Sequence, residues 1–147
     1  MRGAGSALAR ASIFAAIPDY LQTARDEICL LVQVENRKGM EALDEILKSD
    51  GIDGVFLGPS DLAADMGHIG QAGAAEVKET VLGAIRKIVT AGKAGGILTL
   101  DPQTQTACRD LGATFIATEI DVTLFVRNIR EAAKGAGERL QNGAAPR

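Results

Sequence analysis

Polar side chains follow each of four short apolar segments in this chain. Gln33 and Glu35 end the first segment, "CLLVQVE", and the later ones are followed by Ser60 and Asp61, by Asp101, and by Glu119 and Asp121. Functional groups that follow several parallel strands meet at one edge of a sheet, where the active sites of α/β barrels lie. The pattern therefore favours an architecture that places functional groups at the ends of several strands.

The chain alternates between strand and helix patterns, which predicts an α/β fold with a parallel sheet covered by helices. Strands are predicted at the apolar segments, over residues 28–35, 54–58, 95–100 and 114–118. Helices are predicted over residues 17–27, 38–50 and 75–91, from Pro102 to a stop at Gly112, and over 122–136. Residues 59–73 are predicted to form a loop with one helical turn.

Two α/β architectures compete for this pattern. A doubly wound sheet usually carries a glycine-rich phosphate loop after its first strand, but here Glu35 is followed by "NRKG". A barrel places functional groups at the ends of several strands, as this chain does. Because a barrel needs about eight strands to close around its side chains, the four predicted strands indicate half of a barrel.

Four segments resemble the HpcH/HpaI family of metal-dependent pyruvate aldolases: "LVQVENRKGM", "GIDGVFLGPSDLAADMG", "KAGGILTL" and "LGATFIATEIDVTLF". The specific part of this likeness is Val-Glu at one strand end combined with Gly-Pro-Ser-Asp-Leu at the next. The resemblance implies a (β/α)8 TIM-barrel type of fold of which only the second half is present, strands five to eight with their helices. It assigns residues 1–137 to the partial barrel and 138–147 to a flexible C-terminal tail.

The resemblance implies an enzyme, a carbon–carbon lyase. The family reaction is the reversible aldol cleavage of a 4-hydroxy-2-oxo acid, such as 4-hydroxy-2-oxoheptanedioate, to pyruvate and an aldehyde. The cleavage passes through an enolate, which a divalent metal held by oxygen ligands stabilises as a Lewis acid. The likeness assigns Glu35 and Asp61 as the metal ligands. Two carboxylates that leave coordination positions open suit Mg²⁺ or Mn²⁺, with Co²⁺ as an alternative.

The same matching implies six substrate-binding residues: Gln33, Gly58, Pro59, Ser60, Asp61 and Leu98. The Gly58–Asp61 turn precedes a helix, where backbone N–H groups bind the pyruvate carboxylate. Gln33 hydrogen-bonds the substrate or a ligating carboxylate, and Leu98 packs against the pyruvate methyl group. The catalytic histidine and arginine of the family belong to earlier strands of the barrel, so no catalytic residue is assigned in this chain.

The two metal-ligand assignments have structural alternatives. Glu35 can be a solvated carboxylate at a strand end that pairs with Arg37 or Lys38. Asp61 can be an early helix residue, favoured there by the helix macrodipole. The combination of both motifs is what favours the metal site.

Three further positions also leave alternatives open. Gln33 can be a buried amide that the neighbouring backbone satisfies. His68 is the only histidine, but its glycine-flanked loop predicts a structural or rim position and not a general base. Glu119 stands where relatives usually carry glycine, and the sequence gives no role for it.

Composition narrows the function classes. The net charge is −3 from 16 basic and 19 acidic residues, and the basic residues are scattered, which argues against nucleic-acid binding. No apolar run approaches the roughly 20 residues of a membrane span, and the N-terminus lacks the apolar core of a signal peptide. Cys29 and Cys108 indicate neither a zinc site nor a disulfide framework and are predicted to be small core residues. We therefore expect a cytoplasmic protein that binds neither nucleic acid nor a membrane. Its small-molecule partner, a 2-oxo acid, is what the family resemblance implies.

A half barrel would expose strand edges and apolar surface. We therefore expect a homo-oligomer or pairing with the missing N-terminal half. An alternative function is a truncated, non-catalytic half-barrel that acts as a structural or interaction module. A weaker alternative is a phosphoenolpyruvate-type barrel enzyme that acts on a related three-carbon acid.

Overall fold

The computed structural model describes residue 5 and residues 8–143 and divides the chain into two compact units, Met1–Leu30 and Leu31–Arg147. The first unit contains the short 3-10 helix η2 (Arg10–Ser12) and helix α1 (Tyr20–Glu27). The helix predicted over residues 17–27 is therefore shorter at its start. Asp19, the residue before α1, has a left-handed φ of 52°, which interrupts helical geometry ahead of Tyr20.

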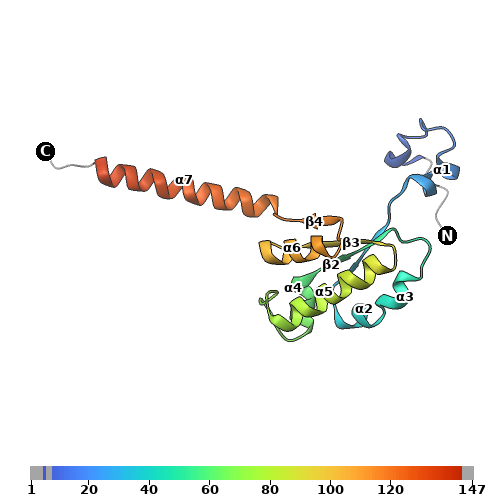
Figure 1. Cartoon of the computed structure of the whole chain (residues 1–147). Helices are drawn as coiled ribbons and strands as arrows, with labels where there is room; N and C mark the ends of the chain where they lie inside the picture. The colour runs from blue at the N-terminus through green and yellow to red at the C-terminus, as the bar shows by residue number, and fades with distance from the viewer. Residues whose placement is uncertain (1–4, 6–7, 144–147) are drawn as a thin grey trace. The chain divides into compact units, whose positions relative to one another are not determined.

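The second unit is built around a parallel sheet of four strands, in the order β1-β2-β3-β4. Strands β2, β3 and β4 are labelled in Figure 1. The strands are β1 (Leu31–Val34), β2 (Gly54–Leu57), β3 (Ala94–Leu98) and β4 (Phe115–Ala117). The helices are α2 (Arg37–Glu41), α3 (Leu43–Leu47), α4 (Pro59–Asp65), α5 (Ala75–Thr90), α6 (Pro102–Asp110) and α7 (Asp121–Gly143). The predicted α/β fold with a parallel sheet and helices is confirmed.

One face of the sheet packs into the core. On successive strands, the residues that stand opposite one another are Val34, Leu57, Ile97 and Ile116. The first three belong to one buried apolar cluster, and Ile116 packs against it. Helix α5 contributes its buried face to this cluster, namely Val77, Val81, Ala84, Ile85 and Ile88. The apolar period of α5 therefore follows the face that meets the sheet.

Side chains alternate between the two faces of a strand, so the opposite face, here called the open face, carries Leu31, Gln33, Phe56, Leu98 and Phe115. The open face remains partly exposed, with Leu31 at 38% and Phe115 at 50%. The rings of Phe56 and Phe115 contact each other with centroids 5.4 Å apart. They meet over Gly96, where an added Cβ would lie 2.7 Å from the Phe56 ring.

Two predicted elements near the site differ in the structure. The strand predicted over residues 28–35 is β1, Leu31–Val34, because its partner strand begins at Gly54, opposite Leu31. The segment 59–73 was predicted to contain one helical turn, but α4 runs from Pro59 to Asp65. Burial of Leu62 and Ala63 in the core stabilises this longer helix.

Four further helix boundaries follow from local geometry and packing. The helix predicted over residues 38–50 is divided into α2 and α3 at Ala42, whose ψ is −2°, and Leu43 enters the core directly after it. The last helix extends from Asp121 to Gly143, beyond the predicted residue 136. A Lys134–Glu138 pair at 3.9 Å supports the added turns. The predicted stops follow α5 and α6 as expected, since Gly92 and Gly112 have φ values of 74° and 95°.

The two cysteines differ in burial. Cys108 is fully buried in the core, as predicted, and burial raises the pKa of its thiol. The prediction for Cys29 was wrong, because this residue is exposed. Among the described residues, no helix is long and apolar enough to cross a membrane.

Candidate functional site

The predicted site residues lie where β1, β2 and β3 end. Because the three strands are parallel neighbours, these ends share one edge of the sheet. The backbone N–H of Gly58, the residue after β2, donates to the carbonyl of Val34 at 3.1 Å. This bond holds the beginning of the Gly58–Asp61 segment beside the end of β1.

Glu35 lies against the backbone of Gly58. A Cβ added at Gly58 would lie 2.8 Å from the Cβ of Glu35 and 3.0 Å from its Oε2. Gln33 Nε2 donates a hydrogen bond to the same carboxylate oxygen. Only glycine at position 58 leaves room for this arrangement, since real Cβ contacts are essentially never shorter than 3 Å. The observed side-chain partner of Glu35 is Gln33. The alternative ion pair with Arg37 or Lys38 does not form among the described residues.

Two polar contacts fix the turn that follows Glu35. Asn36 caps α2 by accepting a hydrogen bond from the N–H of Gly39 at 2.7 Å. Asp65, at the end of α4, accepts from the N–H of Arg37, also at 2.7 Å. Helix α4, which carries Asp61 in its first turn, is thereby tied to the turn that follows the other predicted metal ligand.

A pocket of about 410 Å³ lies at this edge of the sheet. All six residues predicted to bind substrate line it: Gln33, Gly58, Pro59, Ser60, Asp61 and Leu98. Glu35 is not among the described lining residues, but both Gln33 and Gly58, which its carboxylate adjoins, are. The volume falls within the range of about 300–1,000 Å³ that small-molecule sites occupy. The structure therefore brings the six predicted positions together in one concave site.

Glu35 and Asp61 form a sparse set of donors for a metal. Among the described residues, no group of three His, Cys, Asp or Glu side chains lies close enough together to hold an ion. Two carboxylates are oxygen donors of the kind Mg²⁺ and Mn²⁺ prefer, and they leave positions for water and a ligand. This donor set is compatible with an open metal site and does not match a closed structural one.

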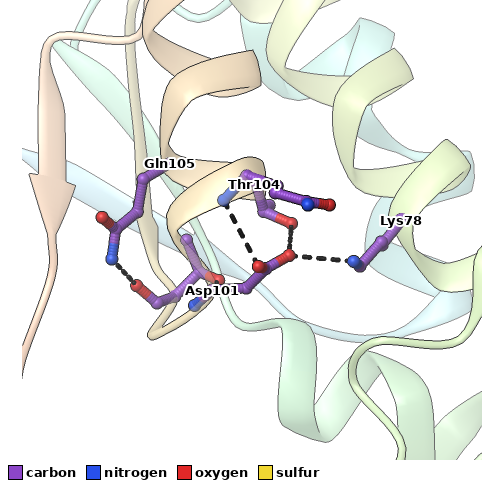
Figure 2. Close-up of polar contacts among 6 residues, drawn as sticks. Lys78, Asp101, Thr104 and Gln105 are labelled. Atoms are coloured by element: carbon purple, nitrogen blue, oxygen red, sulfur yellow. Dashed lines mark hydrogen bonds and ion pairs between the residues drawn. The ribbon is translucent and has the colours of Figure 1, made fainter.

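Lys78 also lines this pocket, although no motif in the sequence marks it. Lys78, near the start of α5, forms an ion pair with Asp101 at 2.8 Å, and Asp101 also accepts from the Thr104 hydroxyl at 2.6 Å (Figure 2). All three residues line the pocket. The strand and helix order could have placed Lys78 here: because α5 runs antiparallel to β3, its first turn lies near the turn that follows that strand.

The polar contacts of Asp101 change its acidity. The hydrogen bond from Lys78 is the largest cause, and the bond from Thr104 adds to it, so the pKa of this carboxyl lies far below its usual range. Asp101 also accepts from the N–H of Gln103, as the N-cap of α6. The segment before Asp101 is also held in place, because Gln105 Nε2 donates to the carbonyl of Thr99 at 2.7 Å (Figure 2).

Two polar residues considered in the sequence lie outside the pocket lining. His68 Nε2 is 3.0 Å from Glu76 Oε2, so the imidazole links the loop after α4 to α5. Glu119 pairs with Arg127 of α7 at 3.4 Å. In the described structure neither residue lines the pocket, which agrees with the structural or rim position predicted for His68.

A family model for HpcH/HpaI aldolase/citrate lyase matches residues 3–128. The chain belongs to this family. The match includes all six pocket residues and Glu35. The resemblance on which their assignment rests is therefore confirmed at the level of the family, and the individual roles stay predictions.

Known relatives carry two kinds of aldolase name. The chain is 60% identical over 131 residues to the hydroxypyruvate/pyruvate aldolase of Roseovarius nubinhibens, covering 89% of this chain and 51% of that protein. It is 47% identical over 145 residues to the 4-hydroxy-2-oxo-heptane-1,7-dioate aldolase of Shigella flexneri, covering 99% of this chain and 53% of that protein. The chain thus spans about half the length of these relatives.

A solved structure shows the same fold. An HpcH/HpaI aldolase/citrate lyase family protein from Burkholderia cenocepacia superposes with a TM-score of 0.83 at 32% identity. The match covers 92% of this chain and 52% of that one. The arrangement of strands and helices described above is therefore shared by about half of a larger family member.

Proposed function

We propose that this chain is the metal- and pyruvate-binding part of a class II pyruvate aldolase. The reaction is the reversible cleavage of a 4-hydroxy-2-oxo acid to pyruvate and an aldehyde, a carbon–carbon lyase reaction. The observation that carries the proposal is the shared pocket: the six residues that the family resemblance assigns, which lie on two motifs and one strand, line a single cavity. Family membership supplies the reaction class.

The site divides its tasks among a few residues. Glu35 and Asp61 would hold the divalent metal, with Mg²⁺ or Mn²⁺ favoured and Co²⁺ as an alternative; when bound, it supplies Lewis-acid stabilisation of negative charge on the substrate's 2-oxo group. Gln33 orients the Glu35 carboxylate through its amide N–H. The Gly58–Asp61 segment receives the pyruvyl carboxylate, and Leu98 receives the methyl group.

Proton transfer requires a group beyond these residues. Asp101 is the other carboxylate in the pocket lining, but its pKa lies far below the usual range because Lys78 and Thr104 hold it as the anion. A base needs a pKa near the working pH, so Asp101 is a poor one. We propose that the histidine and arginine of the family's earlier strands complete the site from another half of the barrel.

We propose that residues 1–137 correspond to strands five to eight of a (β/α)8 barrel, with residues 138–147 as a tail. The four strands pair in sequence order without a switch point, as consecutive barrel strands do. Pairing with an N-terminal half, or with further copies of the chain, would cover the open face.

Metal binding tests the site directly. Mn²⁺ titrated into the purified chain should bind, and Glu35→Ala and Asp61→Ala should each weaken the affinity by more than about tenfold, because each removes one of two ligands. Glu79→Ala, which removes an exposed carboxylate from α5, is the matched control. Equal affinities in all four proteins would reject the site.

A second candidate function is a non-catalytic half-barrel that serves as an interaction module. The exposed apolar side chains of the open face, Leu31 and Phe115, favour it. Aldol cleavage, measured for the chain alone and together with a fragment that carries the first four barrel strands, separates the two. If the chain binds metal but neither assay shows aldol cleavage, the result supports the interaction module.

A further inference from the structure

The Lys78–Asp101 pair places two opposite charges, which cancel, in one wall of the pocket. Among the described lining residues, Lys78 is the only cation, and the acidic ones are Asp61 and Asp101. Lys78 Nζ is 2.8 Å from Asp101 Oδ2, and the two side chains are 37% and 36% exposed. Both groups can therefore meet a ligand, yet together they carry no net charge.

Asp101 is firmly held in this pair. Its Oδ2 accepts from both Lys78 and Thr104, and its Oδ1 accepts from the N–H of Gln103 at 3.3 Å. Its lowered pKa keeps the carboxylate ionised above about pH 4. Compensation of the Lys78 charge is therefore a constant property of the pocket at any ordinary assay pH.

The paired charges affect how strongly the pocket attracts a second carboxylate, one that a ligand carries beyond its pyruvyl group. An isolated ammonium in this wall would attract a second carboxylate, since opposite charges a few ångströms apart attract even in a partly solvated site. With Asp101 beside it, a carboxylate approaching Lys78 also meets a like charge. The pocket lining also includes apolar side chains, among them Ala72, Leu100 and Ile120.

We propose that Lys78 and Asp101 form a specificity-determining wall, which selects 2-oxo acids whose distal end is uncharged over those with a second carboxylate. The inference rests on the proposed function, because that function places the pyruvyl group in the same pocket. Lys78 offers its remaining N–H donors to a neutral polar group, and Asp101 disfavours an anion.

Two 2-oxo acids of equal length test this wall. 2-Oxovalerate and 2-oxoglutarate share the 2-oxo acid head and differ at the fifth carbon, which is a methyl group in one and a carboxylate in the other. Their dissociation constants, measured by calorimetry on the full chain with Mg²⁺, give a preference ratio. The wild-type chain should prefer 2-oxovalerate.

Asp101→Asn removes one charge with little change in shape and uncovers the Lys78 cation. It should shift the ratio toward 2-oxoglutarate by about three- to fivefold, the size expected for one partly exposed charge pair. Lys78→Met removes the cationic partner of Asp101 and should shift the ratio in the opposite direction. The opposite signs separate charge selection from a purely structural effect, which would weaken both ligands alike.

Asp44→Asn is the matched control, because Asp44 pairs with Lys87 at 3.0 Å and neither residue lines this pocket. Its ratio should equal that of the wild type. If Asp101→Asn and Lys78→Met also keep the wild-type ratio while pyruvate still binds, the wall is refuted and the proposed function stands. If the wild-type chain binds neither pyruvate nor the two probes, both proposals fall.

Discussion

The two faces of the sheet differ in how completely this chain covers them. On the helix-covered face, Leu57 and Ile97 are fully buried among residues of the chain's own core, whereas Phe115 on the open face is half exposed. The contrast lies in tertiary contacts and not in the hydrophobicity of the residues. A face that stays apolar without internal cover is typical of a surface that another polypeptide covers.

The largest expected effect compares truncation on the two faces. Leu57→Ala should lower the free energy of unfolding by about 2–5 kcal/mol, because it leaves a cavity in a packed core. Phe115→Ala should cost only about 1 kcal/mol, mainly through its contact with Phe56. Chemical denaturation of both variants measures the difference. Equal losses would mean that the open face is as well packed as the core.

Gly58, at the edge where the site begins, should show the next largest effect. The added methyl group of Gly58→Ala would displace the carboxylate of Glu35, so Mn²⁺ affinity should fall by about 10–100-fold, as for other losses of support to a metal ligand. Gly83→Ala is the control, since a Cβ there meets nothing within 4 Å. Titration with Mn²⁺ reports both, and unchanged binding in Gly58→Ala would contradict the role of Glu35.

Two neighbouring glycines of β3 sharpen the contrast between the faces. A Cβ at Gly96 on the open face would lie 2.7 Å from Phe56 and 3.2 Å from the carbonyl oxygen of Phe115. A Cβ at Gly95 would find its nearest neighbour at 3.5 Å, in ordinary contact with α5. Thermal unfolding should show a loss of about 1 kcal/mol or more for Gly96→Ala and little change for Gly95→Ala. The reverse order would argue against the described packing of Phe56 and Phe115.

The smallest effect concerns pH and the Asp101 cluster. The pKa of Asp101 is lower in the folded chain than its ordinary value of 3.8, so the unfolded state binds more protons and the stabilisation is present above pH 3.8. It is lost as the pH falls toward the folded pKa. The stability difference between wild type and Asp101→Asn should therefore shrink below about pH 4. A difference that stays constant down to pH 2 would exclude this linkage.

The sequence predicted the parts of the fold that depend on local pattern. The strand segments, the long helix at residues 75–91 and the stops at Gly92 and Gly112 agree with the structure because period and glycine geometry are local properties. The boundaries of β1 and α4 were missed. They depend on where β2 begins and on burial of Leu62, and both are set by tertiary contacts.

For the site too, local motifs could be predicted from the sequence and tertiary contacts could not. Motif likeness identified six of the residues that line the pocket at the ends of β1, β2 and β3. Lys78 was missed because nothing near it in the sequence marks it: its partner Asp101 lies 23 positions away. A charged residue in the first turn of a crossover helix deserves comparison with the residues that follow the next strand.

The strand order has a consequence for how the sheet is made. Each strand after β1 pairs with the one that precedes it in the chain, so during synthesis β2, β3 and β4 each emerge after the strand on which they pair. No strand has to wait for a later one to be inserted between two others. The sheet can therefore grow by addition at a single advancing edge, at the pace at which the chain is made.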